Sequence, residues 1–185
     1  MEKGVGNMIL IISTNKELLH HYEFSKPIEE LVKKENQAFA TKKYDKLISK
    51  DLEKATKIII CGTSLKDLEY AKHLEKFNWI KKFDKPIFGI CAGAQIIARI
   101  FGTTLKDSTK IGLEKVIFKK EFLNIKKELQ VYHLHQKKIS SLKNPLENYS
   151  KDNEAFKHKT KQIYATLFHP EVRNSQIISN FIKNG

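Results

Sequence analysis

Short apolar runs alternate with amphipathic stretches over the first hundred residues of the chain. The apolar runs lie at 8–13, 57–61 and 86–90. Runs of this kind, without polar alternation, are typical of strands buried on both faces of a sheet. The amphipathic stretches predict helices over 27–36, 45–55, 64–83 and 92–102, and a further short strand is expected at 38–41. The stretch 64–83 is apolar at every third position from 65 to 80, behind Ser64 as a plausible cap.

The second half of the chain has a different pattern. Three segments resemble strands joined by short connections, at 113–120, 128–136 and 163–170, and 174–184 has the pattern of a helix. Some of these strands should therefore be antiparallel. Strands that alternate with helices favour a parallel sheet covered on both faces. We expect an α/β fold, a three-layer α/β/α sandwich with a mostly parallel central sheet, as one domain over 8–185 behind a loose lead-in at 1–7.

Composition limits the class of protein. Of 185 residues, 41% are hydrophobic and 30% are charged, a balance typical of a globular domain that folds without disulfides or metals. Two cysteines are too few for a secreted disulfide framework and are not spaced as a zinc knuckle requires. The apolar runs are too short to span a bilayer, and no secretory signal follows Met1. We expect a cytoplasmic protein with no membrane partner.

The net charge of +13 raises the question of a nucleic-acid partner. However, Arg99 and Arg173 are the only arginines, and the lysines are scattered along the chain and interleaved with glutamate. Base recognition and phosphate clamps favour arginine, whereas dispersed lysine is typical of solvated helix faces. No nucleic-acid partner is expected.

Candidate chemistry begins at Cys91, between a predicted strand and a predicted helix in the sequence GICAG. A nucleophile at a sharp strand-to-helix turn needs small neighbours, and Gly89 and Gly93 provide them. The free N–H groups of the helix that begins at Ala92 favour the thiolate and can also hold an oxyanion. A buried structural cysteine would explain this stretch equally well.

A second motif, FHPE at 168–171, favours the catalytic interpretation. On an extended backbone His169 and Glu171 point to the same side. The carboxylate can then orient the imidazole, and the imidazole can take the proton of the Cys91 thiol. The sequence thus predicts a nucleophile, a base and an orienting group in the chain order Cys, His, Glu.

With GICAGAQ at 89–95 and FHPE at 168–171, the chain resembles the class I glutamine amidotransferases, which carry G-x-C-x-G-x-Q and H-P-E in this order. The resemblance covers the chain from Met8 and implies a flavodoxin-like α/β/α fold with no cofactor. It also implies a γ-glutamyl thioester on Cys91, acid–base work by His169 with Glu171, and glutamine binding by Gln95. The segment 155–172 is most similar to the glutaminase subunit of archaeal two-subunit GMP synthetases, which pass ammonia to a separate ATP-dependent synthetase.

Two departures from the family pattern stand out. The family has two glycines before the long helix, and the N–H of the second helps form the oxyanion hole. Here Gly62 is kept, but Thr63 replaces the second glycine, and a β-branched residue does not easily adopt a positive φ. The resemblance also implies a Ser-His pair near 131–136 at the substrate pocket, where this chain has Leu134 and His135.

Three functions are consistent with these residues. The first is a glutaminase subunit that hydrolyses L-glutamine and supplies ammonia to a synthetase, with GMP synthetase as the first candidate. A chain without a nucleotide-binding motif cannot perform the amination itself, so a partner is implied. The second is a hydrolase of other γ-glutamyl conjugates, and the third is a non-catalytic glutamine-binding or regulatory module.

Two further hypotheses concern the remaining histidines and cysteines. His133 and His135 share a strand face and could form a metal site with His169, but no cysteine or carboxylate completes the spacing, so no metal is expected. Cys61 and Cys91 end neighbouring predicted strands, close enough for a disulfide that would switch off the nucleophile.

Overall fold

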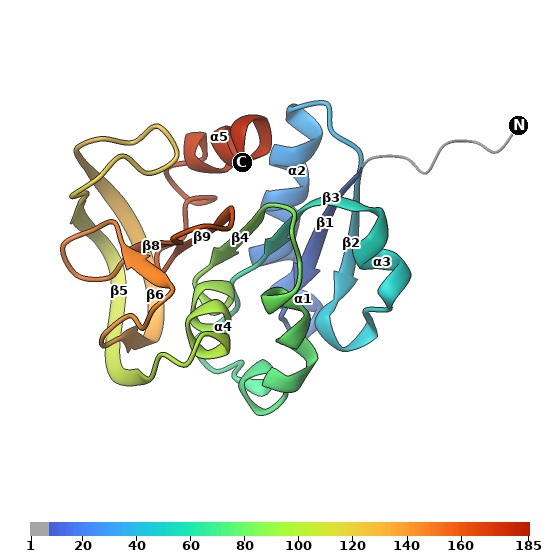
Figure 1. The fold of residues 1–185 in the computed structure, drawn as a ribbon, viewed down its shortest axis with the longest axis horizontal. Helices are drawn as coiled ribbons and strands as arrows, with labels where there is room; N and C mark the ends of the chain where they lie inside the picture. Colours follow the sequence, from blue (N-terminus) through green and yellow to red (C-terminus); the bar gives the residue numbers. More distant parts are fainter. Residues whose placement is uncertain (1–7) are drawn as a thin grey trace, which may run out of the picture.

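A seven-stranded sheet forms the centre of the computed structural model, which describes residues 8–185; the predicted lead-in at 1–7 lies outside these residues (Figure 1). The strand order is β2-β1-β3-β4-β9-β8-β7. The strands are β1 (Met8–Ser13), β2 (Phe39–Lys43), β3 (Ala55–Ile60), β4 (Ile87–Ile90), β7 (Leu146–Asn148), β8 (Ala155–His158) and β9 (Ile163–Thr166). The first five strands of the order are parallel, and β8 is antiparallel to both of its neighbours, β9 and β7. The prediction of a mostly parallel sheet is confirmed.

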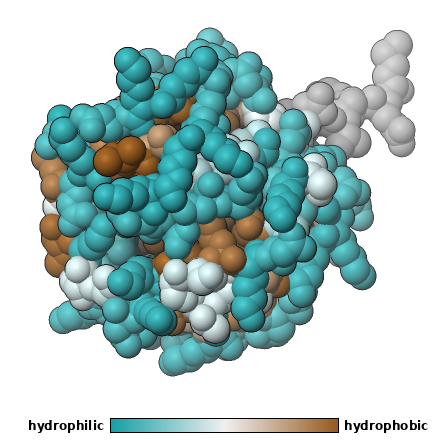
Figure 2. Space-filling model, turned by 60° about the vertical axis from the view of Figure 1, so that its left-hand side comes forward, coloured by the Kyte–Doolittle hydropathy of each residue, from teal (hydrophilic) through white to brown (hydrophobic). Residues whose placement is uncertain are grey.

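A two-stranded antiparallel sheet packs beside the central one and consists of β5 (Leu105–Ile117) and β6 (Glu128–Ile139). Both strands agree with the sequence pattern, but β5 begins eight residues before the predicted start at 113. The exposed residues Ile111, Leu113 and Ile117 lie on β5. Figure 2 brings this side of the molecule forward and shows a surface that is mostly hydrophilic, with hydrophobic areas between the polar side chains.

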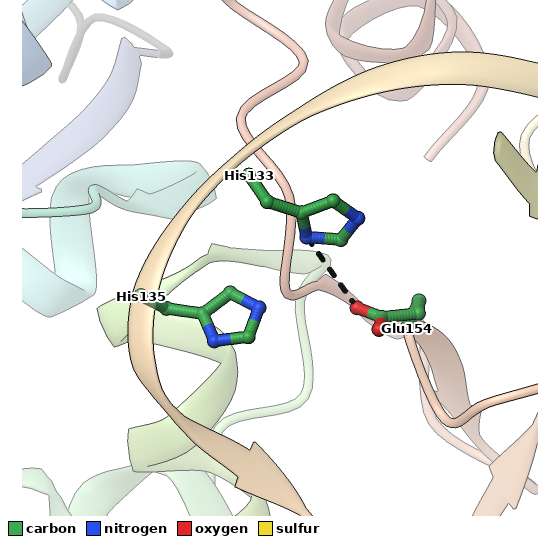
Figure 3. Close-up of side chains that lie close together, drawn as sticks. All are labelled: His133, His135 and Glu154. Atoms are coloured by element: carbon green, nitrogen blue, oxygen red, sulfur yellow. Dashed lines mark ion pairs between the residues drawn. The ribbon is translucent and has the colours of Figure 1, made fainter. Parts of the chain in front are cut away.

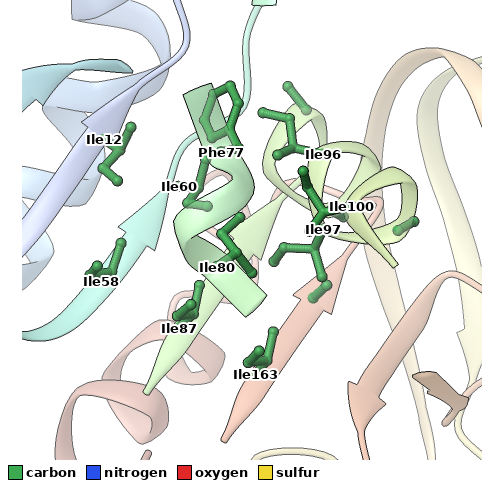
Figure 4. Packing of buried hydrophobic residues seen from close by; sticks show 14 of the residues in the cluster. Ile12, Ile58, Ile60, Phe77, Ile80, Ile87, Ile96, Ile97, Ile100 and Ile163 are labelled. Carbon is green, nitrogen blue, oxygen red and sulfur yellow. The ribbon is translucent and has the colours of Figure 1, made fainter. Parts of the chain in front are cut away.

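Side-chain alternation along the central strands divides the core into two layers. Leu10 and Ile12 face a cluster that contains residues of α4 (Ala92–Ile100) and of the 3₁₀ helix η4 (Leu74–Lys81), shown in Figure 4. Ile9 and Ile11 face the opposite cluster, with α2 (Lys26–Lys34) and α5 (Gln176–Asn184). Successive residues of a strand point to opposite faces, so a fully apolar strand needs helices on both. The predicted three-layer sandwich is therefore confirmed.

The predicted long helix over 64–83 is wrong. Residues 61–68 form a loop without a helix start at Ser64, and two 3₁₀ helices follow, η3 (Glu69–Lys72) and η4. The apolar positions recur every third residue, and a 3₁₀ helix has 3.0 residues per turn, so its i and i+3 side chains share one face. Phe77 and Ile80 are fully buried on that face. The period is that of a 3₁₀ helix rather than of an α-helix.

The other differences concern shorter elements, and β7 and β8 have no counterpart among the predicted strands. The predicted helix 45–55 is divided into a 3₁₀ turn, η2 (Tyr44–Lys46), and α3 (Ser49–Lys54). A short α1 (Leu18–His20) and a π-helical turn, η1 (His21–Ser25), have no counterpart in the predicted elements. The strand predicted over 163–170 ends at Thr166. His169 and Glu171 therefore lie in the turn that follows and not on the strand. Within 8–185, no helix has the length and apolar character needed to cross a bilayer.

Candidate active site

Cys91 occupies the one-residue turn between β4 and α4. Its backbone has φ 48° and ψ −98°, a conformation that costs a non-glycine residue about 1–3 kcal/mol. Hydrogen bonds hold the turn from both sides: the Cys91 N–H donates to the Thr166 carbonyl at 2.8 Å, and the Cys91 carbonyl accepts from the Gln95 N–H at 3.0 Å. The expected sharp turn is present, and strain of this kind is concentrated at functional sites.

The two glycines of GICAG allow α4 to pack directly on the sheet. A Cβ atom at Gly89 would lie 2.5 Å from Ile97 Cδ1 and 2.7 Å from the Gly93 carbonyl carbon. A Cβ atom at Gly93 would lie 2.3 Å from the Ile60 carbonyl oxygen. Small residues are therefore required at both positions, as the sequence indicated, because the helix backbone lies against β3 and β4.

His169 and Glu171 lie in the turn after β9 and contact each other. The His169 Nδ1 and Glu171 Oε1 atoms are 2.7 Å apart, and both side chains are 1% exposed. The prediction that an extended backbone aligns them is wrong. A turn, closed by the Val172 N–H that donates to the His169 carbonyl at 3.2 Å, brings the imidazole and the carboxylate together instead.

The structure also brings His169 to Cys91, which lies 78 positions earlier in the chain. A Cβ atom at Gly62 would lie 2.6 Å from His169 Cε1 and 3.3 Å from Cys91 Cβ. The side chains of His169 and Cys91 therefore both lie next to Gly62. Glu171 is hydrogen-bonded to Nδ1 of the imidazole, and Nε2 is buried without a hydrogen bond to another described residue. Burial lowers the pKa of His169, but the negative charges of Glu171 and Cys91 outweigh it and raise that pKa well above its usual value. The surroundings thus favour a protonated imidazole.

Thr63 lies in the loop after β3 and is held there by its hydroxyl. Its Oγ1 donates to Asp67 Oδ2 at 3.2 Å, and the same carboxylate oxygen accepts the Lys16 N–H at 2.6 Å. Thr63 has no positive φ, so its β-branched side chain is accommodated without the strain considered from the sequence. Ala92 begins α4, where backbone N–H groups have no partner within the helix. Neither Thr63 nor Ala92 donates its backbone N–H in the hydrogen bonds recorded among residues 8–185.

Gln95 and His135 both line a small cavity beside Cys91. The Gln95 side chain accepts from the Tyr70 hydroxyl at 2.8 Å and donates to the Lys137 carbonyl at 3.2 Å. The cavity measures about 20 Å³, which is room for about one water molecule. The Cys91 Sγ atom lies 3.5 Å from the Leu134 carbonyl oxygen, and both residues line the cavity. Of the residues expected at the site, Thr63, Cys91, Ala92, Gln95 and His135 line this cavity, whereas Gly62, His169 and Glu171 do not.

A sequence profile described as Glutamine amidotransferase class-I matches residues 15–185. The chain belongs to this family. Curated relatives include a glutamine-hydrolysing GMP synthase subunit of Methanobrevibacter smithii, 33% identical over 117 residues, which are 56% of this chain and 62% of that protein. The corresponding protein of Methanosphaera stadtmanae is 38% identical over 117 residues, 56% of this chain and 63% of the relative. The matched region thus spans less than two thirds of these relatives.

Solved structures show the same fold. A crystal structure of a Thermoplasma acidophilum protein, assigned as one of the subunits of GMP synthase, superposes with a TM-score of 0.83 at 24% identity, covering 96% of this chain and 93% of that one. A glutamine amidotransferase from Thermotoga maritima gives a TM-score of 0.70 at 19% identity, covering 96% and 81%. The α/β/α sandwich expected from the resemblance to class I glutamine amidotransferases is the fold that these proteins have.

Three residues with roles around this amidotransferase site were missed from the sequence. Tyr70 holds Gln95, and Asp67 ties the Thr63 loop to the segment after β1. Both lie in 64–83, where the expectation of a continuous helix hid them. The third is Glu154, whose carboxylate lies beside His133 and His135 (Figure 3). The statement that no carboxylate completes a metal set with these histidines is wrong, and the sequence contained no signal for it.

The two cysteines are both free thiols, although β3 and β4 are neighbours as expected. Cys61 is fully buried, and burial raises the pKa of its thiol, which keeps the sulfur protonated and slow to react. A disulfide between Cys61 and Cys91 remains a prediction.

Proposed function

We propose that this chain is a glutaminase subunit that hydrolyses L-glutamine to glutamate and ammonia through Cys91, His169 and Glu171. The observation that carries the proposal is the strained turn at Cys91 beside a buried imidazole that a carboxylate orients. A buried structural cysteine needs neither the strain nor the paired imidazole. Membership of the class I glutamine amidotransferase family supports the same activity.

Before the first half of the reaction the thiol proton passes to His169 Nε2, as the raised pKa of that imidazole favours. The Cys91 thiolate then bonds to the side-chain amide carbon of glutamine. The C–N bond then breaks, and His169 gives the proton to the departing nitrogen. Ammonia leaves, and a γ-glutamyl thioester remains on Cys91. Glu171 stabilises the imidazolium throughout, which fits the raised pKa of His169.

In the second half, water adds to the thioester carbon and gives one proton to His169. The C–S bond breaks, the proton returns to the sulfur, and glutamate is released. In both halves negative charge develops on the carbonyl oxygen, and the backbone N–H groups of Thr63 and Ala92 are the donors placed to stabilise it. Gln95 and His135 line the cavity that would hold the substrate.

The size of that cavity implies that the chain on its own is weakly active. About 20 Å³ beside Cys91 is far too small for a glutamine side chain, so the walls must separate before substrate enters. Its walls are the loop after β3 and the middle of β6. We infer that a separate ATP-dependent synthetase opens the site when it binds and receives the ammonia. The similarity to glutamine-hydrolysing components of GMP synthase makes GMP synthetase the first candidate.

The test measures glutamate release from L-glutamine with and without an archaeal GMP synthetase. Activity that the synthetase increases, that Cys91→Ala abolishes and that Cys61→Ala retains supports the proposal. Cys61 is the matched control because it is also a buried cysteine at the end of a neighbouring strand. The same assay with γ-glutamyl conjugates separates the rival hydrolase, since activity on conjugates alone rejects the amidotransferase assignment.

Labelling separates the non-catalytic alternative. A glutamine-analogue electrophile should modify Cys91 and leave Cys61 unmodified when the synthetase is present. If Cys91 stays unlabelled and no glutamate forms with any candidate synthetase, the chain is a binding or regulatory module and the proposed reaction is rejected.

A further inference from the structure

The two histidines of β6 form a buried group with Glu154. His133 and His135 are two residues apart on the strand, so both side chains point to the same face, toward Glu154 in the turn before β8 (Figure 3). One ligand atom from each residue lies within 4.8 Å of the other two. The His133 Nδ1 and Glu154 Oε2 atoms are 3.7 Å apart.

We propose that His133, His135 and Glu154 bind a divalent transition metal ion, with zinc as the best fit. Zinc binds imidazole nitrogen and carboxylate oxygen at about 2.0–2.2 Å, so tetrahedral ligand atoms lie about 3.4 Å apart. The 3.7 Å contact is close to that value, and no pair of ligand atoms has to approach by more than about 1.4 Å, within reach of side-chain rotation. Two imidazoles and one carboxylate suit zinc better than magnesium or calcium, which prefer oxygen ligands.

The polar atoms of this group lack protein partners. Neither ring nitrogen of His133 or His135 has a hydrogen bond to another described residue, nor does Glu154 Oε2. The residues are 0%, 2% and 4% exposed, respectively. Buried polar atoms are nearly always partnered, because an unpaired one costs about 1–3 kcal/mol. One metal ion would bond to three of these atoms at once, and a neutral imidazole supplies the lone pair that it needs.

The charges around the group leave room for a cation. Lys110 Nζ bonds to Glu154 Oε1 at 2.8 Å and to Glu114 Oε2 at 2.9 Å. Lys110 thus orients the Glu154 carboxylate and leaves Oε2 facing His133. With neutral histidines, the two carboxylates and one ammonium carry a net charge of −1, which a divalent ion changes to +1. Glu114 and Glu154 together therefore offset the repulsion from Lys110.

The position of the group gives the ion a consequence for the active site. His135 also lines the cavity beside Cys91. The backbone N–H of His169 donates to the carbonyl of Tyr132, the residue before His133, at 2.8 Å. A metal on His135 removes this side chain from the substrate cavity. Zinc binding should therefore inhibit glutamine hydrolysis; this consequence rests on the proposed function, whereas binding itself does not.

The direct test titrates the purified chain, stripped with a chelator, with Zn²⁺ by calorimetry and with Co²⁺ by visible absorption. One equivalent should bind, with the intense d–d bands of a four-coordinate cobalt site. Glu154→Gln keeps the size of the side chain, and both it and His133→Leu should weaken binding by about 100-fold or more. His158→Gln is the matched control, a buried histidine on β8 outside the group, and should bind as the wild type does.

Two results overturn the proposal: the wild type binds no stoichiometric ion at micromolar concentrations, or Glu154→Gln and His133→Leu bind as tightly as the wild type. Circular dichroism of each variant verifies that it is folded, and Cys91→Ser excludes the thiol as the binding group if it binds normally. In the glutaminase assay, zinc should inhibit the wild type and not His133→Leu. Binding without inhibition rejects only the consequence, and absence of glutaminase activity leaves the binding result intact.

Discussion

Gly62 offers a sharp test of the arrangement at Cys91, because one methyl group there meets both catalytic candidates. In Gly62→Ala, the new Cβ would lie 2.6 Å from His169 Cε1, 3.2 Å from His169 Nδ1 and 3.3 Å from Cys91 Cβ. An ordinary contact between carbon atoms is about 3.5–4.0 Å, so the imidazole must move by about 1 Å.

The imidazole has little freedom to move without losing its partner. It is 1% exposed, bonded to Glu171 at 2.7 Å and packed on Phe24 with ring centroids 5.6 Å apart. A displacement of about 1 Å at a reacting group costs about 100-fold in rate, or about 2.7 kcal/mol of transition-state stabilisation. Overpacking at a buried site costs a further ~1–3 kcal/mol of folding stability.

The assay compares kcat/KM for glutamate release, in the presence of the synthetase, between the wild type and Gly62→Ala. The rate of Cys91 alkylation by iodoacetamide gives a second readout that needs no partner. Lys66→Ala is the matched control, since Lys66 is exposed in the same loop and should change neither rate. Urea unfolding of all three proteins gives the stability cost. If folded Gly62→Ala keeps kcat/KM within about threefold of the wild type, His169 does not act on Cys91 in this geometry.

Three further outcomes are expected. Gly93→Ala should lower the free energy of unfolding by about 3 kcal/mol or more, because its Cβ would lie 2.3 Å from the Ile60 carbonyl oxygen; an unchanged urea midpoint would contradict the packing of α4. Glu171→Gln should move the alkaline limb of the pH profile of kcat/KM to lower pH. The charge of Glu171 raises the pKa of His169, which is protonated only below that pKa; an alkaline limb that stays in place would refute the coupling. Lys57→Met removes two hydrogen bonds, of 2.6 and 3.1 Å, to carbonyls in the last turn of α5 and should cost about 1–3 kcal/mol in urea unfolding. The matched control Lys50→Met changes an exposed lysine and should cost little.

The fold was predictable from the sequence where local patterns decide the structure. The apolar runs at 8–13, 57–61 and 86–90 form β1, β3 and β4 because a strand buried on both faces admits no polar residue. The prediction of an α-helix over 64–83 was wrong for a local reason as well, since apolar residues at every third position fit a 3₁₀ helix. The predicted start of β5 and the predicted end of β9 were wrong because strand ends depend on pairing with other strands, which the sequence of one segment does not specify.

The sequence by itself determined the sharp turn at Cys91, since a strand, a helix and two glycines around one cysteine define such a turn through short-range sterics. It also supplied the imidazole and the carboxylate at 169 and 171, two residues apart. Only the tertiary structure decided which imidazole nitrogen Glu171 holds, how closed the cavity is, and that Glu154 lies beside two histidines about twenty positions earlier. These features depend on how the strands order and pair, and contacts between distant segments are fixed by packing of the whole core rather than by local preference.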